Sequence, residues 1–397
     1  MVGFGCNLMS STERTTTHVP SRERSRRILH LIDTGGPGGA ETVYVELVRR
    51  LAGAGWESIP VIPEVDWLDH ALRAEGFDPI CMHGGRRFEF DYARRLRSLI
   101  RHRAVDLVQT HMLGSSVYGT LACADSSIPV VSTFHGHPDV RTTDRLRALK
   151  MRLLSRSNNR VVCVSESLRT HFERSGPFPS GAEVIENGID TTVFSPGGLD
   201  GRVRAELGIA PDAPLLGAVG NVRASKDYPS LLRAFAQVHR AVPASRLVIV
   251  GQGSGELQAE VERLRADLGL EGAVHFAGFR DDVADFLRSL DLFVLSSSDE
   301  GFSLVTVQAM ATGLPVVATR CGGPEQIVGD SGGAVLVPPR DPDALAAALL
   351  DVLARPDLGK RLGAAGRARA AEAFSVERMV SRYVELYERC LPEGRSH

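Results

Sequence analysis

From residue 28 to residue 337, short apolar runs rich in β-branched residues alternate with longer segments that mix apolar and polar positions. The apolar runs have the length of buried strands, and the mixed segments have the spacing of helices with one apolar face. This alternation predicts βαβ units and a parallel sheet. The expected strands are 28–32, 58–62, 105–110, 129–133, 160–164 and 182–185 in the first half, and 215–220, 246–250, 274–276, 292–295, 315–318 and 334–337 in the second.

The alternation stops between residues 188 and 214, where Gly, Pro and Asp accumulate, as is typical of a connection between domains. Two such series predict an α/β protein with two doubly wound, Rossmann-like domains that face each other across a cleft. Ligands of such sheets bind beyond the carboxyl ends of the strands. We place the domains at 26–195 and 196–374. A final helix at 375–397 follows, with Ser375 as its N-cap.

Composition narrows the class of protein. The 397 residues are 43% hydrophobic and 24% charged, which is typical of a soluble globular protein, and the net charge of −2 argues against nucleic acid as a partner. No apolar run reaches the roughly 18 residues of a membrane span. The six cysteines form no C-x-x-C pair and predict reduced thiols in a cytoplasmic protein. Residues 1–25, rich in Ser, Thr and Arg, predict a disordered extension.

The segment from Leu292 to Thr319 carries the most specific chemistry. An apolar strand ends in a polar loop, and a helix from about residue 304 to 311 follows before a second buried strand. Backbone N–H groups and the positive end of the helix therefore meet at one point, which suits a phosphate. The carboxylate of Glu300 can accept hydrogen bonds from sugar hydroxyls. The segment predicts a site for a sugar joined to a phosphate.

The same segment resembles the E-x7-E signature of retaining glycosyltransferases of the group 1 type, the large family 4 with the GT-B fold. Glu300 occupies the first acidic position, and Gln308 occupies the second. The family assigns the second carboxylate to the ribose hydroxyls of the nucleotide. Glutamine keeps an acceptor oxygen, but it lacks the charge and brings two donors. The resemblance implies that the donor contacts Gly301, Phe302, Ser303, Leu304 and Gln308.

Two cations follow a strand of the second half, in the segment from Gly220 to Asp227. Cations beside a diphosphate gain most as the leaving group departs, because its negative charge grows. The family pattern places an Arg and a Lys on the diphosphate. Lys226 matches the Lys, whereas Asn221 holds the usual Arg position, so Arg223 is the expected substitute. The alternative is a solvated Lys/Arg pair.

Glycine-rich turns follow two further strands. The first lies at residues 33–41 and contains Gly38 and Gly39, whose backbone can approach a ligand closely; a tight turn without a ligand is the alternative. The second contains Gly251 and Gly253. Its G-x-G-x-G spacing departs from the dinucleotide fingerprint. The resemblance implies that these loops and Phe279 border the donor, with Phe279 beside the base.

Histidines end two strands of the first half. His135 lies in a T-F-H segment, and the resemblance implies that it contacts the transferred sugar. His111 is a second candidate, for the acceptor. An isolated histidine at a strand end is more often structural, and two of them near one cleft favour the functional interpretation. The resemblance extends from Ile28 to Arg389.

The resemblance implies that the first domain faces the acceptor and the second binds the nucleotide sugar. The reaction would move a hexose from a UDP- or GDP-linked donor to a glycan, lipid-linked or small-molecule acceptor with retention, in cell-envelope or exopolysaccharide biosynthesis. Catalytic roles fall to Glu300, His135, Lys226 and Arg223. No cofactor or metal is expected, because the D-x-D at residues 341–343 is typical of a helix start.

Two other functions remain open from the sequence. A non-catalytic sugar-nucleotide-binding protein is compatible with Gln308 and Asn221, since both depart from the family pattern. An NAD-dependent oxidoreductase is the second alternative.

A basic run extends from residue 141 to residue 160, with leucines at 146, 149, 153 and 154. Helical spacing predicts an amphipathic helix that could lie on an anionic membrane at the inner membrane face. The alternative is a helix that packs its leucines on the first-domain sheet.

Overall fold

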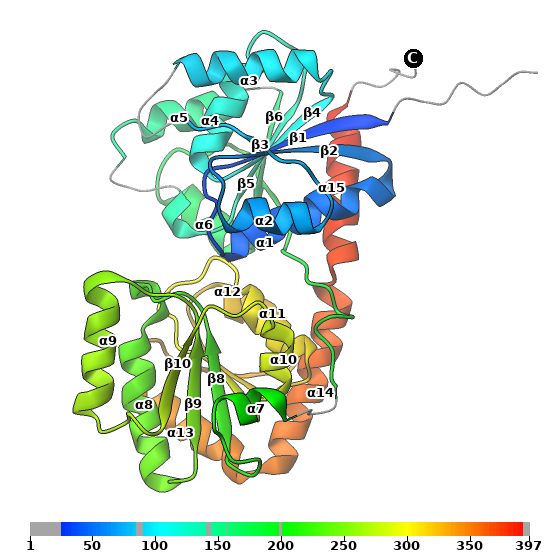
Figure 1. Ribbon diagram of the computed structural model, residues 1–397. Coiled ribbons are helices and arrows are strands. Elements are labelled where there is room, and N and C mark those ends of the chain that lie inside the picture. The colour runs from blue at the N-terminus through cyan, green and yellow to red at the C-terminus, as the bar shows by residue number, and fades with distance from the viewer. Residues whose placement is uncertain (1–24, 85–89, 140–143, 157, 198–200, 392–397) are drawn as a thin grey trace, which may run out of the picture.

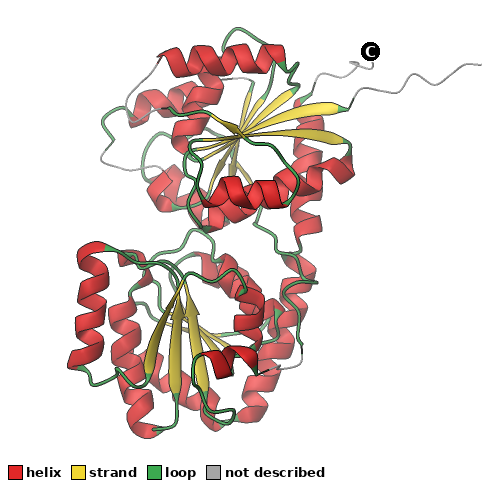
Figure 2. Cartoon of the chain, in the orientation of Figure 1, coloured by secondary structure: helices red, strands yellow, loops and turns green. Residues whose placement is uncertain are grey.

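The computed structural model describes residues 25–84, 90–139, 144–156, 158–197 and 201–391. The extension expected at residues 1–25 lies outside the described residues, except for Ser25. Two domains are stacked one above the other, and each has a sheet with helices on both of its faces (Figure 1 and Figure 2). Every strand pair in both sheets is parallel. The predicted fold class is confirmed.

The N-terminal domain has a seven-stranded sheet in the order β3-β2-β1-β4-β5-β6-β7. Its strands are β1 (Arg26–Ile32), β2 (Trp56–Ile62), β3 (Ile80–Cys81), β4 (Leu107–His111), β5 (Val130–Phe134), β6 (Asn159–Cys163) and β7 (Glu183–Val184). Its helices are α1 (Gly39–Arg50), η1 (Leu51–Ala54), α2 (Trp67–Ala74), α3 (Phe90–His102), α4 (Leu113–Ala122), η2 (His137–Asp139), α5 (Arg147–Leu154) and α6 (Glu166–Arg174).

The C-terminal domain has a six-stranded sheet in the order β10-β9-β8-β11-β12-β13. Its strands are β8 (Leu215–Val219), β9 (Arg246–Val250), β10 (Val274–Gly278), β11 (Leu292–Leu295), β12 (Val316–Thr319) and β13 (Val335–Val337). The helices are α7 (Arg202–Glu206), η3 (Ala224–Lys226), α8 (Tyr228–Ala241), α9 (Gly255–Asp267), α10 (Val283–Arg288), α11 (Leu304–Ala311), α12 (Gly323–Val328), α13 (Pro342–Ala354), α14 (Pro356–Ala373) and α15 (Val376–Cys390).

The strand order reverses at one place in each sheet. The reversal lies between β1 and β4 in the N-terminal domain and between β8 and β11 in the C-terminal domain. The loops that follow these strands diverge to opposite faces of the sheet and leave a crevice, which is where α/β proteins bind ligands. The loops after these four strands therefore determine the chemistry of the site.

Helix α15 returns to the N-terminal domain and runs along its side (Figure 1). Tyr383 and Tyr387 are fully buried there, and their hydroxyls lie 3.0 Å from Thr133 Oγ1 and Gln109 Oε1. The side chain of Ser375 accepts a hydrogen bond from the Arg378 amide, as expected of an N-cap. One hydrophobic cluster contains buried residues of both domains and of α15, which ties the domains together.

The sequence located most elements to within one or two residues, and α11 spans residues 304–311 as predicted. Strand β3 was not predicted. The basic helix is shorter than expected and its leucines do not share one face: Leu154 is buried, whereas Leu146 and Leu149 are 49% and 63% exposed. No helix in the described part of the chain is long and apolar enough to cross a membrane.

Candidate active site

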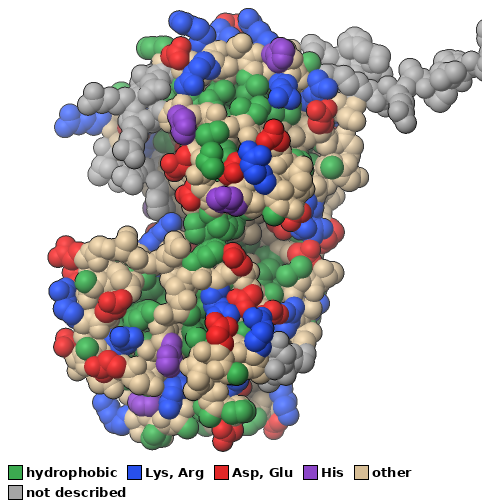
Figure 3. All heavy atoms as spheres, viewed as in Figure 1, with side chains coloured by type: hydrophobic (Ala, Val, Ile, Leu, Met, Phe, Trp, Pro, Cys, Tyr) green, Lys and Arg blue, Asp and Glu red, His purple; other side chains and the backbone are tan. Residues whose placement is uncertain are grey.

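A cleft of about 780 Å³ separates the two domains and lies at the reversal point of each sheet. The space-filling view shows the two lobes and the notch between them (Figure 3). Of the site residues predicted from the sequence, all but Gly253 and His111 line the cleft. They are Gly38, Gly39, His135, Asn221, Arg223, Lys226, Gly251, Phe279, Glu300, Gly301, Phe302, Ser303, Leu304 and Gln308.

Glu300 and Lys226 are in direct contact. The Lys226 ammonium donates to Glu300 Oε1 at 2.6 Å, and the Ser297 hydroxyl donates to the same oxygen at 2.7 Å. Both charged side chains are less than one-fifth exposed. The loop after β8 thus supplies a cation to the loop after β11. Each of these two side chains therefore holds the other in position at the cleft.

Two further cations line the C-terminal wall. Arg223 is exposed to the cleft, on the same loop as Lys226. Arg280 also lines it, but its guanidinium forms ion pairs with Glu206 and Asp282. Arg223 is therefore the better placed of the two to meet an incoming diphosphate. Arg280 directly follows Phe279 in the chain but was not predicted as a site residue.

Asn221 connects the two domains. Its amide donates to Pro37 O of the N-terminal glycine loop at 3.1 Å, and its carbonyl accepts from the Gln252 amide at 2.9 Å. Asn221, at the position where the family pattern has an arginine, thus links its own loop by hydrogen bonds to the loops that contain Pro37 and Gln252. It lines the cleft as expected, and both of its contacts are hydrogen bonds that an uncharged amide can make.

Two glycines allow backbone segments to approach each other at the cleft. A Cβ on Gly301 would lie 2.6 Å from His135 O, across the domain boundary, and one on Gly251 would lie 2.1 Å from Gly220 O. Any side chain at these positions would push the loops apart. Gly253 has a different role, since a Cβ there would meet Val222 and Gln258 rather than the cleft.

The amino end of α11 also lies at the cleft. Ser303 precedes the helix and is 1% exposed, and its hydroxyl accepts from the Thr306 hydroxyl at 2.8 Å. The amides of Thr306 and Val307 donate to Ser303 O, and no side chain caps the helix, so within the described residues the amides of Leu304 and Val305 are left for a phosphate. Gln308 lies one turn further, half-buried at the cleft.

His135 is held from two directions. Its Nε2 lies 2.8 Å from His111 Nδ1, the two rings are stacked, and the Asp139 carboxylate accepts from the His135 amide at 2.6 Å. Burial lowers the pKa of His135 to about 3, so its ring is neutral. Its Nδ1 has no hydrogen-bond partner within the described residues and remains for a ligand. His111 is fully buried behind it, so the prediction that His111 faces the acceptor is not supported.

Several residues of the N-terminal wall were not predicted as site residues. Asp33 and Glu41 lie in or beside the glycine loop, Trp67 begins α2, Asp139 ends η2, and Asn187 follows β7. Each residue occurs in a segment with a separate structural explanation, such as a turn or a helix start. Only the arrangement of β1, β2, β5 and β7 in one sheet brings them together.

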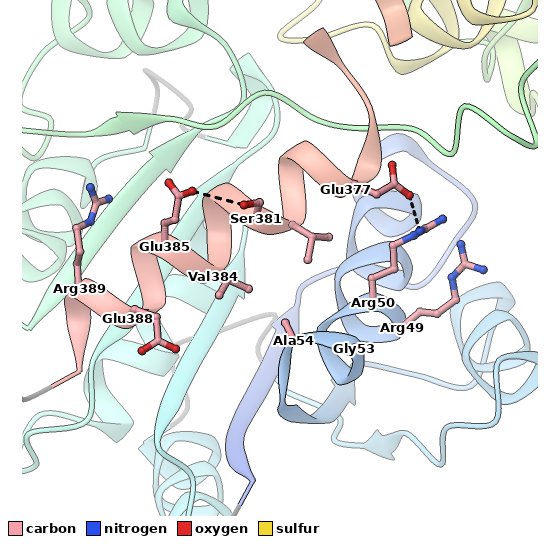
Figure 4. Close-up of a pocket in the computed structure, with 11 residues that line it drawn as sticks. Arg49, Arg50, Gly53, Ala54, Glu377, Ser381, Val384, Glu385, Glu388 and Arg389 are labelled. Atoms are coloured by element: carbon pink, nitrogen blue, oxygen red, sulfur yellow. Dashed lines mark hydrogen bonds and ion pairs between the residues drawn. The ribbon is translucent and has the colours of Figure 1, made fainter. Parts of the chain in front are cut away.

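A second hollow, of about 980 Å³, lies between α15 and the end of α1 with η1 (Figure 4). It is far from the strand ends, and its charged groups bond to one another. Arg50 donates to Glu377 at 2.8 Å, and the Ser381 hydroxyl lies 3.4 Å from Glu385 Oε1. This hollow follows from the way α15 crosses the domain, and the smaller cleft is the better candidate site.

Comparisons with known proteins agree with this assignment. The family model described as "Glycosyltransferase Family 4" matches residues 37–193, and the model described as "Glycosyl transferases group 1" matches residues 213–355. A D-inositol 3-phosphate glycosyltransferase of Segniliparus rotundus is 31% identical, over 75% of this chain and 70% of that protein. A lipopolysaccharide core biosynthesis glycosyltransferase, LpsE of Rhizobium meliloti, is 28% identical, over 89% of this chain and 96% of that protein.

Among solved structures, HepE of Anabaena in complex with UDP-glucose superposes with a TM-score of 0.82 at 23% identity, covering 91% of this chain and 99% of that chain. This similarity concerns the fold. Together with the sequence relatives and the geometry of the cleft, it shows that the chain belongs to the group 1 glycosyltransferases, with a GT-B fold.

Proposed function

We propose that the protein transfers a hexose from a UDP- or GDP-linked donor to a hydroxyl of an acceptor, with retention of the anomeric configuration. The observation that carries the proposal is the contact between Glu300 and Lys226, in a cleft that also contains Arg223, His135 and the amino end of α11. The family assignment favours a transferase over the oxidoreductase alternative.

In the proposed complex the donor diphosphate lies between Lys226, Arg223 and the first turn of α11. A lysine ammonium has three donors, and Glu300 uses one of them, so Lys226 can keep its contact with Glu300 and also reach a phosphate oxygen. The negative charge on the diphosphate increases as the bond to the sugar breaks. Preorganised cations and backbone N–H groups therefore stabilise the transition state more than the ground state.

The hexose would lie between Glu300 and His135. Oε1 of Glu300 is engaged by Lys226 and Ser297, which fixes the carboxylate and leaves Oε2 for a sugar hydroxyl. His135 offers a neutral ring with Nδ1 unpartnered. The two groups come from opposite domains, so the sugar is positioned only when both walls are in place.

Retention follows if the acceptor oxygen attacks on the face that the diphosphate leaves. The bond between the anomeric carbon and the phosphate oxygen breaks, and the bond to the acceptor oxygen forms on the same face. The acceptor proton passes to the departing phosphate oxygen. No protein carboxylate takes up the sugar in this route, and Lys226 and Arg223 balance the charge of the diphosphate without a metal ion.

The direct test is nucleoside diphosphate release by the purified full-length protein, with UDP- and GDP-hexoses and with EDTA present. UDP-glucose is the first donor to assay, since the Anabaena structure contains it. We expect turnover that survives chelation and a product whose anomeric configuration, measured by NMR, matches the donor. Tight nucleotide binding without any turnover would favour the non-catalytic alternative, and an inverted product would contradict the front-face route.

The relatives suggest where to search for acceptors. One is named for a phosphorylated polyol and another for lipopolysaccharide core biosynthesis, so polyols and cell-envelope glycans are the first candidates.

We also propose peripheral contact with an anionic membrane through α5. Leu146 and Leu149 are exposed, and Arg145 and Arg152 beside them are exposed as well. Exposed leucines flanked by arginines can insert among lipids while the charges meet headgroups. Vesicle co-sedimentation should show binding that requires anionic lipid and weakens with added salt. Replacing both leucines with serine should reduce it; equal recovery with neutral vesicles would contradict the contact.

A further inference from the structure

The N-terminal wall of the cleft is acidic. Asp33, Glu41 and Asp139 line it. Among the described residues of the N-terminal domain that line the cleft, none is Lys or Arg. The C-terminal wall carries both signs of charge, with Arg223, Lys226 and Arg280 beside Asp281, Asp299 and Glu300. Among the described residues that line the cleft, Lys and Arg therefore lie on the C-terminal wall alone, and a ligand end at the N-terminal wall meets carboxylates without them.

Asp33 is the most prominent acid of this wall. It follows β1, and its carboxylate accepts from the backbone amides of Gly114 and Ser115 at the start of α4. A Cβ on Gly114 would lie 2.7 Å from Asp33 Oδ2, so the carboxylate fits closely against the helix. A carboxylate has about four acceptor sites, so the two amides leave others for a ligand.

The electrostatic surroundings of Asp33 favour a donor or a positive charge. The side chain is exposed within the cleft, but the enclosing walls reduce its hydration and raise its pKa, and the nearby Asp139 adds to this shift. Lys150 acts in the opposite direction, but its ammonium is paired with Asp144 at 2.7 Å. A hydroxyl or ammonium group from a ligand would stabilise the Asp33 carboxylate.

A second polar side chain of this wall has an acceptor atom that receives no hydrogen bond. Asn187 lines the same cleft and is 4% exposed, and its side-chain carbonyl oxygen has no hydrogen-bond partner within the described residues. A buried acceptor without a donor is unfavourable, so a ligand that donates would satisfy it. Trp67, half-buried at the cleft, adds an apolar ring face of the kind that packs against a flat ligand.

We propose that the acceptor is a ring compound rich in hydrogen-bond donors, whose hydroxyl or ammonium groups bind Asp33 and Asn187, and that it carries no phosphate at this wall. The inference rests on the proposed function, because it assigns the acceptor end of the same site. A phosphate would bring further negative charge to a wall where burial already raises the pKa of Asp33 to about 7 and that of Asp139 to about 6, and like charges repel. An ammonium in place of a hydroxyl would gain a charge-assisted hydrogen bond.

The test uses three matched ligands: glucose, glucosamine and glucose 6-phosphate. Their binding to the full-length protein saturated with UDP or GDP would be measured by calorimetry at pH 7. We expect glucosamine to bind most tightly and glucose 6-phosphate about tenfold more weakly than glucose. Glucose 6-phosphate binding as tightly as glucose, or no binding by any of the three, would overturn the inference.

Variants at Asp33 separate this role from a general loss of structure. Asp33→Asn should remove the advantage of glucosamine over glucose, and Asp33→Lys should shift the preference toward glucose 6-phosphate. Asp125→Asn is the matched control on the same domain, because Asp125 pairs with Arg97 at the surface. An unchanged order of affinities in Asp33→Lys would contradict the assignment of Asp33.

The same samples distinguish a failure of the proposed function from a failure of the proposed acceptor class. UDP or GDP should bind the wild-type protein and all three variants equally, since the nucleotide site lies on the other wall. Absence of nucleotide binding in the wild type contradicts the proposed function. Normal nucleotide binding combined with a preference for the phosphorylated sugar contradicts only the acceptor class.

Discussion

The two walls of the cleft are built in the same way but differ in charge: the C-terminal wall carries cations as well as carboxylates, whereas the described residues of the N-terminal wall include carboxylates and no Lys or Arg. In each domain the central pair of strands, β1 with β4 and β8 with β11, ends at the point where the strand order reverses. The loop after β1 provides Asp33 and a glycine-rich turn, whereas the equivalent loop after β8 provides Arg223 and Lys226. The fold therefore determines where a ligand lies, and the loop residues determine which end of it each wall receives.

The walls also differ in how they keep polar groups inside the protein. On the C-terminal side, Lys226 and Glu300 form an ion pair that is partly open to solvent. On the N-terminal side, His30 and His111 are buried behind the wall and His135 lines the cleft, and burial lowers the pKa of each ring, so all three are neutral. A charged pair can shift to stabilise a developing charge, while neutral rings mainly position a ligand. The predictions below test this division.

The largest expected effect comes from Glu300→Ala, which removes the carboxylate that we propose orients the hexose from the C-terminal wall. We expect turnover to fall about 100-fold through loss of positioning. Binding of UDP or GDP should largely survive, because the diphosphate contacts other groups. Turnover and calorimetric nucleotide binding would both be measured. Turnover near the wild-type rate would show that this wall does not hold the sugar.

Lys226→Ala removes the cation in contact with Glu300. We expect kcat to fall between about tenfold and 100-fold and donor binding to weaken, because the cation matters most as the diphosphate leaves. Arg223→Ala should have the same kind of effect, somewhat smaller. Arg280→Ala is the matched control, since its guanidinium is paired with Glu206 and Asp282. Steady-state kinetics that do not respond to Arg223→Ala would leave Lys226 as the only cation on the diphosphate.

The neutral histidines of the N-terminal side predict a loss of stability in acid. Burial lowers the pKa of His30 from 6.5 to about 3, so the unfolded chain binds a proton that the folded protein does not. Stability is thus present above pH 6.5 and is lost as the pH falls. This histidine alone should cost about 2 kcal/mol between pH 7.5 and pH 5. Urea unfolding of His30→Asn should show a smaller loss than the wild type; an identical pH slope would mean that His30 is charged in the fold.

The smallest effect is expected from Gln308→Glu, which restores the carboxylate of the family pattern at the edge of the C-terminal wall. If Gln308 faces the ribose hydroxyls, the charged acceptor should tighten nucleoside diphosphate binding about twofold to fivefold. Calorimetry with UDP and GDP would measure it. A large loss of affinity would mean that the amide donates a hydrogen bond that a carboxylate cannot provide.

The sequence alone determined the class of fold and most of the donor wall. Alternating strands and helices are local patterns, so they predicted two parallel sheets, and the segment after β11 predicted α11 with its correct bounds. Glu300, Lys226 and Gln308 lie in contiguous motifs whose chemistry can be recognised without knowing the fold. Gly253 is the exception among the glycines, because its turn packs against Val222 and Gln258 instead of the cleft.

Only the tertiary structure decided what lies opposite the donor. Asp33, Asn187 and Trp67 are separated by long stretches of sequence and become one wall through the pairing of β1 with β4 and the position of β7. The bond from Asn221 to Pro37 likewise joins residues of different domains. Such contacts depend on how two rigid sheets face each other, and no local pattern in the chain encodes that arrangement. The proposed acceptor wall therefore depends on the structure, whereas the motifs of the proposed donor wall were already recognisable in the sequence.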